Sequence, residues 1–355
     1  MQENNQNNYQ NSDFLEETEE NTPNTQFVPV YIPVKVQTPL EKEKKQIRKN
    51  ALLVGLSCLL MTGITYIWGA VYFAVMSALG VPYEQAYKMA NDPFVLQILQ
   101  IIISVLMFTL PFIIVFKLGG YKISRTVMLD SPKKEYNLPL ILMGIGFCAF
   151  ANISVSIAGS IFSGFGIDYN VDYGENPNGI LGFLISFIST AIVPALVEEF
   201  ACRGLMLGSL KKYGEGFAII ASSAIFGLIH GNFEQIPFAF LIGIILGFIT
   251  VKSGSIWLAL IIHSFNNAVS VVMSYITKGM TDDLQVIIYN IYLMVALIIG
   301  ILGIVILSRR DENGFSVKNV KTDCSEWQKN KWFFTHPTII ILVCVCLIES
   351  ILFFF

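Results

Sequence analysis

Long apolar runs dominate this sequence and limit its fold more than any other feature. Nine segments approach the roughly 20 mostly apolar residues that a helix needs to cross about 30 Å of hydrocarbon. They cover residues 51–80, 94–116, 137–163, 179–197, 216–231, 236–251, 255–277, 285–308 and 337–355. With 54% hydrophobic and 14% charged residues, the 355-residue chain is too apolar for a soluble protein. We therefore predict an all-α, polytopic membrane protein, a bundle of about eight to nine transmembrane helices.

Positive charges collect at alternate ends of these segments. Lys and Arg precede the first segment and follow the second, fourth, sixth and eighth, whereas the loops after the third and seventh carry mainly Asp. Short cytoplasmic loops are enriched in Lys and Arg, so the pattern predicts a cytosolic N-terminus. The Asn-, Gln- and Glu-rich beginning of the chain hints at a bacterial source, which would make this an integral protein of a bacterial cell membrane.

The same reading divides the chain into five parts. We expect a disordered cytosolic tail over 1–46, N-terminal transmembrane helices over 47–136 and a catalytic membrane core over 137–308. A cytosolic loop over 309–336 and an extra apolar helix over 337–355 follow. A net charge of -3 and the lack of basic tracts beside aromatic residues exclude nucleic acid as a partner. The six cysteines form no CxxC pair, and we interpret them as buried thiols without a redox role.

Two adjacent carboxylates and an arginine stand out at the cytosolic end of the fourth segment. Residues 194–203 read PALVEEFACR, which places Glu199 and Arg203 four residues apart on one helical face, with Glu198 about 100° away. We predict that Arg203 neutralises Glu199 and leaves Glu198 free as a base or metal ligand, although the reverse assignment also fits. The non-catalytic alternative is an ordinary charge cluster at the end of a membrane helix.

Two of the three histidines in the chain lie inside apolar segments. His230 ends the run Phe226-Gly-Leu-Ile-His230, and His263 shares a helical face with Asn267, four residues further on. Alone, each histidine is more often an interhelical hydrogen-bonding residue than a ligand. Ionisable groups at membrane depth are costly, however, and together these side chains supply a base and an oxyanion stabiliser for attack of water on a carbonyl. The chain has no HExxH motif, which sets the pattern apart from zincin metalloproteases.

The three motifs resemble the signature of the CPBP intramembrane protease family, which includes CAAX proteases and the bacteriocin-processing or Abi proteins. EExxxR is met by Glu198, Glu199 and Arg203, FxxxH by Phe226 and His230, and HxxxN by His263 and Asn267. The resembling region covers roughly residues 137–305. The resemblance implies an all-α membrane core with an intramembrane catalytic cavity that opens to the cytosolic side.

The resemblance also assigns roles to the motif residues. Glu198 would activate water with help from His230, and His263 and Asn267 would stabilise the oxyanion, with Glu199 completing the catalytic set and Arg203 and Phe226 as structural support. Two histidines and a glutamate would also suit a Zn²⁺ with one open position, held by Glu198, His230 and His263. The motifs leave a zinc and a metal-free glutamate mechanism equally open.

The predicted function is therefore intramembrane endopeptidase activity on a membrane-associated peptide or protein, similar to that of CAAX prenyl proteases. Bacteriocin self-immunity, or a membrane scaffold without required proteolysis, is the alternative, and a proton-coupled carrier is a third hypothesis that the lack of internal repeats disfavours.

Overall fold

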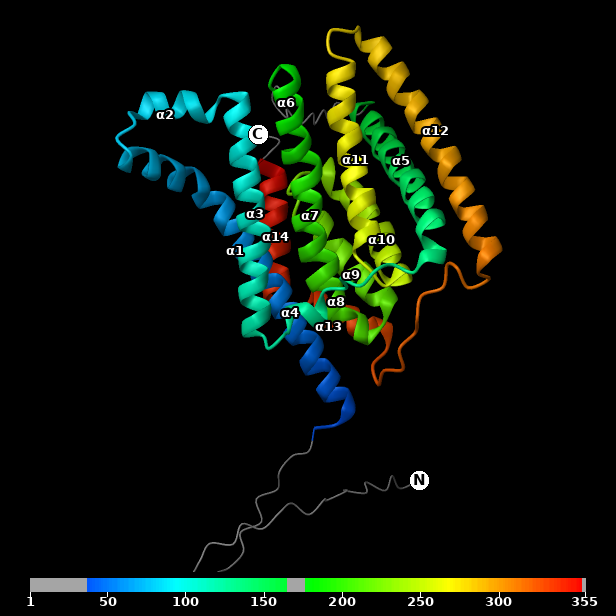
Figure 1. Ribbon diagram of the computed structural model, residues 1–355. Helices are drawn as coiled ribbons and strands as arrows, with labels where there is room; N and C mark the ends of the chain where they lie inside the picture. The colour runs from blue at the N-terminus through cyan, green and yellow to red at the C-terminus, as the bar shows by residue number, and fades with distance from the viewer. Residues whose placement is uncertain (1–36, 165–175, 353–355) are drawn as a thin grey trace, which may run out of the picture. The chain divides into compact units, whose positions relative to one another are not determined.

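A computed structural model describes residues 37–164 and 176–352 of the chain (Figure 1). The first 36 residues of the predicted tail and the acidic segment 165–175 lie outside this part. All regular secondary structure in the described residues is helical, which confirms the all-α prediction. The elements are α1 (Pro39–Ala78), α2 (Tyr83–Ala90), α3 (Pro93–Leu118), α4 (Ile123–Thr126), α5 (Lys134–Gly164), α6 (Gly179–Ser186), η1 (Phe187–Ile192), α7 (Val193–Glu199), η2 (Phe200–Leu207), α8 (Gly208–Leu210), η3 (Lys211–Tyr213), α9 (Glu215–Leu228), α10 (Gln235–Ser253), α11 (Trp257–Ile276), α12 (Asp282–Arg310), α13 (Glu326–Phe334) and α14 (Pro337–Leu352).

Seven helical elements of the described residues are long and apolar enough to cross a membrane. The pair α13 and α14, bent by 66°, gives an eighth span if it is counted as one. The expected ninth span is not found, because the apolar segment 216–231 folds as α9, which has only 14 residues. At 1.5 Å per residue this helix is about 21 Å long, less than the hydrocarbon thickness. The protein is thus a polytopic helical membrane protein with seven or eight spans in its described part.

Two helices begin inside segments that the sequence pattern assigned to a tail and a loop. Helix α1 begins at Pro39, where Thr38 and Glu41 form a capping box: the Thr38 hydroxyl accepts from the Glu41 amide at 3.2 Å, and the Glu41 carboxylate accepts from the Thr38 amide at 3.0 Å. A second capping box, between Ser325 and Gln328, starts α13. Both capping boxes consist of polar residues within a single helical turn, so the pattern of apolar runs does not reveal them.

The predicted fourth span is longer than expected. A continuous helical element runs from Gly179 to Tyr213, 35 residues, straight through Pro194. Two wide π-helical segments interrupt the α-helix, η1 just before the proline and η2 after α7, and η1 contains Thr190, whose carbonyl the proline cannot bind. The glutamate motif therefore lies well inside this element and not at its end, where the sequence analysis had placed it.

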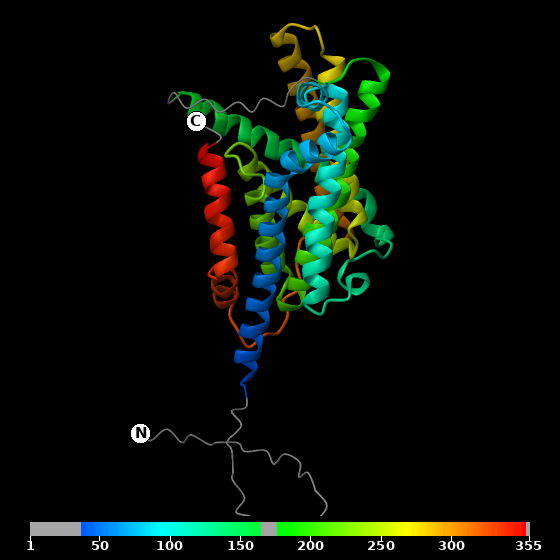
Figure 2. The ribbon, with the colours of Figure 1, turned by 90° about the vertical axis from the view of Figure 1, so that its left-hand side faces the viewer.

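The helices pack around two main groups of buried side chains. One group joins α1, α3, η2, α9, α13 and α14, and the other joins α5, α10 and α11. Helix α14 lies beside α1, and α12 lies along the outer side of α5 (Figures 1 and 2). The Gly179–Tyr213 element lies between α3 and α11, in contact with both. The glutamate motif is thereby enclosed on several sides by other helices.

Close contact between α5 and α12 depends on glycine. A Cβ added to Gly146 would lie 2.3 Å from the Cα of Gly300, and one added to Gly300 would lie 2.5 Å from the Cα of Gly146. These neighbours are backbone atoms, so the helices would have to move apart. Small residues of this kind allow membrane helices to approach closely.

We expect Gly146→Ala to destabilise the protein by about 1–3 kcal/mol, the range for overpacked sites, because it forces α5 and α12 apart. Thermal unfolding in detergent measures the effect. Gly159→Ala, in the same helix, is the matched control, since a Cβ there meets nothing within 4 Å. Equal melting temperatures for the two variants would contradict the close packing of α5 and α12.

Candidate active site

Glu199 is the most deeply buried charge of the site. Its side chain has 0% exposure, and its Oε1 accepts two hydrogen bonds, from Arg203 Nη1 at 2.8 Å and from His263 Nδ1 at 2.8 Å. The Arg203 contact is the pairing that the spacing of the motif predicted. A carboxylate only accepts, so the proton on His263 that faces it lies on Nδ1. Glu199 thus links the arginine of η2 to the histidine of α11.

Glu198 faces the opposite side of the His263 ring. Its Oε2 lies 3.8 Å from His263 Nε2, which is longer than a hydrogen bond, and its side chain is 13% exposed against 0% for Glu199. One carboxylate is therefore held by an arginine and a histidine, and its neighbour in sequence has no comparably close partner. This is the division between the two glutamates that the helical geometry suggested.

The Phe226 ring connects the three motifs. The guanidinium carbon of Arg203 lies 4.3 Å from the ring centroid, and the His263 ring meets it edge-on at 5.9 Å. The His230 ring is also edge-on to it, at 5.0 Å. An aromatic face attracts a cation, which helps to hold Arg203 in this apolar environment. The aromatic residue of FxxxH is thus a packing centre for the charged groups.

His230 follows the end of α9, in the turn that separates this short helix from α10. Its Nδ1 lies 2.7 Å from the Phe226 carbonyl oxygen. Since a carbonyl accepts, Nδ1 carries the proton, and in the neutral ring Nε2 keeps a free lone pair. Gly231 has a φ of +64°, a conformation that favours glycine and allows the chain to turn directly after the histidine.

Asn267 contacts the helix that carries the glutamates, at a site created by Pro194. A proline has no N–H, so Pro194 cannot donate to the Thr190 carbonyl four residues before it. The side-chain amide of Asn267 donates to this carbonyl at 3.3 Å. Its oxygen accepts from the Asn266 amide, also at 3.3 Å. One hydrogen of the Asn267 side-chain amide therefore bonds α11 to η1, and the second hydrogen is not used in this contact.

Two buried polar atoms of this cluster have no hydrogen-bond partner among the described residues: Glu199 Oε2 and Arg203 Nη2. Native proteins satisfy nearly all such atoms, and exceptions gather at functional sites. The Thr190 carbonyl that Asn267 binds was not singled out in the sequence, because a backbone oxygen gives no distinctive side-chain pattern. It belongs to the site only through its position in the folded chain.

The predicted zinc ligands do not form a metal-binding group in this arrangement. Within residues 37–164 and 176–352, no three His, Cys, Asp or Glu side chains are gathered in a way that could hold a metal ion. Glu198 Oε2 and His263 Nε2 are 3.8 Å apart, but no third side chain of these types is gathered with them among the described residues. We therefore derive no step through zinc.

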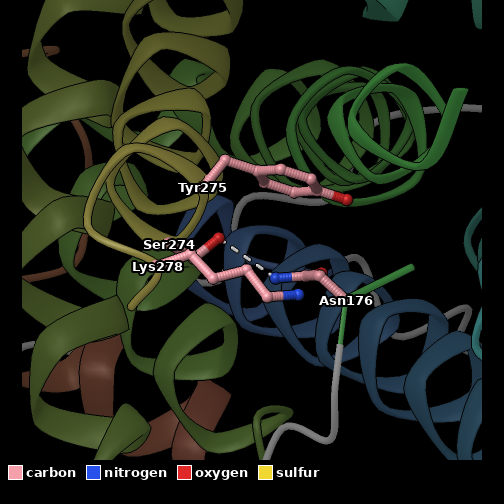
Figure 3. A pocket seen from close by; sticks show the side chains of 4 residues that line it. All are labelled: Asn176, Ser274, Tyr275 and Lys278. Carbon is pink, nitrogen blue, oxygen red and sulfur yellow. Dashed lines mark hydrogen bonds between the residues drawn. The ribbon is translucent and has the colours of Figure 1, made fainter. Parts of the chain in front are cut away.

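A surface hollow of about 260 Å³ lies elsewhere, at the far end of α11 (Figure 3). It is lined by Asn176, Ser274, Tyr275 and Lys278, and the Asn176 amide donates to the Ser274 hydroxyl at 3.0 Å. Tyr275 is twelve residues beyond His263, about 18 Å along the helix. No motif residue lines the hollow, so it is not the catalytic cavity that the family resemblance implies.

These features define a class of protein: a polytopic α-helical membrane protein with a carboxylate, histidine and amide site buried between helices. Residues 180–269, which contain every motif residue, match the model of the type II CAAX prenyl endopeptidase Rce1-like family. The comparisons thus confirm the resemblance to CPBP-family proteases in this part of the chain.

Two curated bacterial proteins are similar to the chain. YdiL of Bacillus subtilis (strain 168), a membrane peptidase by name, is 27% identical over 157 residues, which cover 42% of this chain and 63% of YdiL. The membrane-embedded CAAX protease MroQ of Staphylococcus aureus (strain USA300) is 29% identical over 147 residues, covering 39% of this chain and 59% of MroQ. The chain therefore spans less than two thirds of the length of either relative. No solved structure gives a significant match.

Proposed function

We propose that this protein is an intramembrane endopeptidase that hydrolyses a peptide bond with water activated by Glu198. The observation that carries the proposal is the different environment of the two adjacent glutamates. Glu199 is held by Arg203 and His263, whereas Glu198 has no hydrogen-bonding partner among the described residues and lies 3.8 Å from the same histidine. A carboxylate left free beside an imidazole is suited to accept a proton from water. The likeness to CAAX proteases supports the same assignment.

The proposed reaction begins when Glu198 takes a proton from water and the resulting hydroxide attacks the carbonyl carbon of the scissile bond. His230, with Nδ1 bonded to the Phe226 carbonyl, assists through the lone pair on Nε2. Negative charge then develops on the substrate oxygen. The His263 side chain and the unassigned amide hydrogen of Asn267 stabilise it, as preorganised donors do in other hydrolases. Protonated Glu198 returns its proton to the leaving amine, and the C–N bond breaks.

Glu199 and Arg203 act indirectly in this scheme. The Glu199 carboxylate fixes the orientation of the His263 ring through the hydrogen bond with its Nδ1. Arg203 balances the charge of Glu199, and Phe226 packs against the guanidinium. A positioned donor is worth more than a mobile one because no reorganisation is needed during the reaction.

The substrate class follows from the position of the site. A motif enclosed by apolar helices is reached most readily by a membrane-associated peptide or protein, which we propose as the substrate. We also propose that the N-terminus is cytosolic and that the membrane is a bacterial cell membrane. The beginning of α1 and the Lys- and Arg-bearing ends of α3, α10 and α12 lie at the same side of the bundle (Figure 1), as the enrichment of positive charge in cytoplasmic loops requires.

The test is cleavage of a library of synthetic peptides, each an apolar stretch followed by a varied octapeptide, by purified protein in detergent. Mass spectrometry identifies the products. We expect cleavage by the wild type and about a 10²–10⁴-fold slower reaction for His230→Ala, which removes the assisting imidazole. No cleavage by the wild type would favour the scaffold or immunity alternative.

A chelator arm of the same experiment addresses zinc. We expect wild-type cleavage to survive treatment with a strong zinc chelator, because the described residues form no three-ligand group in this arrangement. Loss of cleavage that added Zn²⁺ restores would show that Glu198, His230 and His263 rearrange to bind the metal, and would contradict the metal-free scheme.

A further inference from the structure

Helix α14 lies outside residues 180–269, and it carries a charge in an otherwise apolar sequence. Glu349 is the only charged residue between Pro337 and Leu352. It lies twelve residues after Pro337, about 18 Å along the helix, a distance shorter than the roughly 30 Å thickness of a hydrocarbon layer. A carboxylate at such depth is costly and is retained where it has a function.

Two contacts place Glu349 beside the candidate active site. Its Oε1 accepts a hydrogen bond of 2.7 Å from the hydroxyl of Tyr66 on α1. Its other oxygen, Oε2, lies against Gly231, since a Cβ built on that glycine would be only 3.2 Å away. Gly231 directly follows His230. The α14 carboxylate is thus held at the turn that carries one of the two active-site histidines.

The charge of Glu349 is not neutralised by the protein in the described residues. No ion pair there involves it, and its one hydrogen-bonding partner, Tyr66, is neutral. The same turn carries a second carboxylate, Glu234, whose Oε2 is buried without a partner. The only cation in the neighbouring motif cluster is Arg203, which Glu199 already engages. Acidic groups therefore exceed cations around this turn.

The exposure of Tyr66 and Glu349 leaves the Glu349 carboxylate accessible from outside the bundle. The Tyr66 side chain is 66% exposed, and Glu349 is itself half-buried, so the carboxylate can be reached from the outer surface between α1 and α14. The two helices lie side by side in both views of the ribbon (Figures 1 and 2). A peptide that approaches His230 from this side would pass the Glu349 carboxylate.

We propose that Glu349 is a specificity-determining residue that binds a basic side chain, Lys or Arg, next to the scissile bond of the peptide substrate. The inference rests on the proposed endopeptidase function and deepens it. Uncompensated carboxylates favour a cationic partner and disfavour an anionic one, and the effect is strong where water is scarce. Tyr66 holds the carboxylate in position, and Gly231 keeps the space beside it free of a side chain.

The experiment starts from a library peptide that the wild-type protein cleaves. Each position on either side of its scissile bond is replaced in turn by Lys, Arg, Gln or Glu, and kcat/KM is measured in detergent for the full-length chain and for Glu349→Gln and Glu349→Lys. We expect the wild type to prefer Lys or Arg over Glu at one position by about tenfold or more, the effect of roughly 1.4 kcal/mol. Glu349→Gln should abolish the preference, and Glu349→Lys should reverse it.

Two further variants separate recognition from structure. Tyr66→Phe removes the hydrogen bond but keeps the carboxylate, so the preference should persist in weakened form. Glu84→Lys, a charge change of the same sign on the exposed face of α2, should have no effect. A wild-type enzyme that cleaves all charge variants equally, or a Glu349→Gln variant that slows every peptide alike, would overturn the proposal while the peptidase assignment stands. Failure of the wild type to cleave any library peptide would instead remove the proposed function on which it rests.

Discussion

Replacement of Glu198 by Gln should reduce peptide cleavage by about 10²–10⁴-fold, the usual contribution of a general base. Glutamine has the same shape but cannot accept a proton from water. The decrease should appear in kcat with little change in KM, because the carboxylate acts in the transition state. Thermal stability should be preserved, since in the part of the chain that the structure describes Glu198 makes no hydrogen bond and the His263 ring nitrogen Nε2 is 3.8 Å away.

Glu84→Gln is the control for this experiment, because Glu84 is exposed on α2 and far along the chain from the motifs. Full activity in Glu198→Gln would show that the base has been assigned to the wrong residue, and Glu199→Gln would then be tested for the reverse assignment. A loss of activity together with a lowered melting temperature would indicate a structural role for Glu198. The two readings are distinguished by measuring both quantities on the same preparation.

Arg203→Ala should destabilise the protein by about 3–5 kcal/mol, the cost of removing one partner of a buried ion pair. Both side chains are almost completely buried, at 1% and 0% exposure, and truncation would leave Glu199 with His263 as its one hydrogen-bonding partner among residues 37–164 and 176–352. The variant also loses the contact between the guanidinium and the Phe226 ring. Thermal or denaturant unfolding in detergent measures the change.

A double variant tests whether the destabilisation of Arg203→Ala comes from the uncompensated charge of Glu199. Glu199→Gln combined with Arg203→Met removes both charges, and it should be more stable than Arg203→Ala because no uncompensated charge stays buried. The pair Lys252 and Asp311, 3.0 Å apart with 13% and 24% exposure, is the control; Lys252→Ala should change stability far less, because solvent screens an accessible pair. An Arg203→Ala protein as stable as the wild type would be inconsistent with the buried pair.

Much of the fold followed from patterns that are local to one helix. Apolar runs identified the membrane class and most of the spans, since a segment that crosses a bilayer has to be apolar whatever it packs against. Residues 216–231 were wrongly counted as a membrane span, because apolar composition alone cannot distinguish a 14-residue buried helix from a transmembrane helix. The predicted start of α1 was also wrong, because the capping residues Thr38 and Glu41 start this helix within the segment assigned to the tail.

The contacts of the candidate site are also of two kinds: those that spacing within one helix predicts and those that depend on packing between helices. The spacing of Glu199 and Arg203 within one helix was sufficient to predict their contact, because an α-helix brings residues four apart together. No spacing predicts that Glu199 also accepts from His263, 64 residues away in the sequence, or that Asn267 donates to the Thr190 carbonyl. Those contacts depend on which faces of α7, η1 and α11 meet.

The amino-acid sequence by itself determined the membrane class, the identity of the motif residues and the family resemblance, because each depends on composition or on spacing within a single helix. Only the tertiary structure decided that the glutamates lie inside a continuous helix with π-helical turns, that Phe226 packs against Arg203, His230 and His263, and that Glu349 of α14 reaches Gly231. The physical reason is that these contacts arise from the packing of separate helices. The periodicity of one helix shows which of its faces is apolar but does not specify which helix packs against that face.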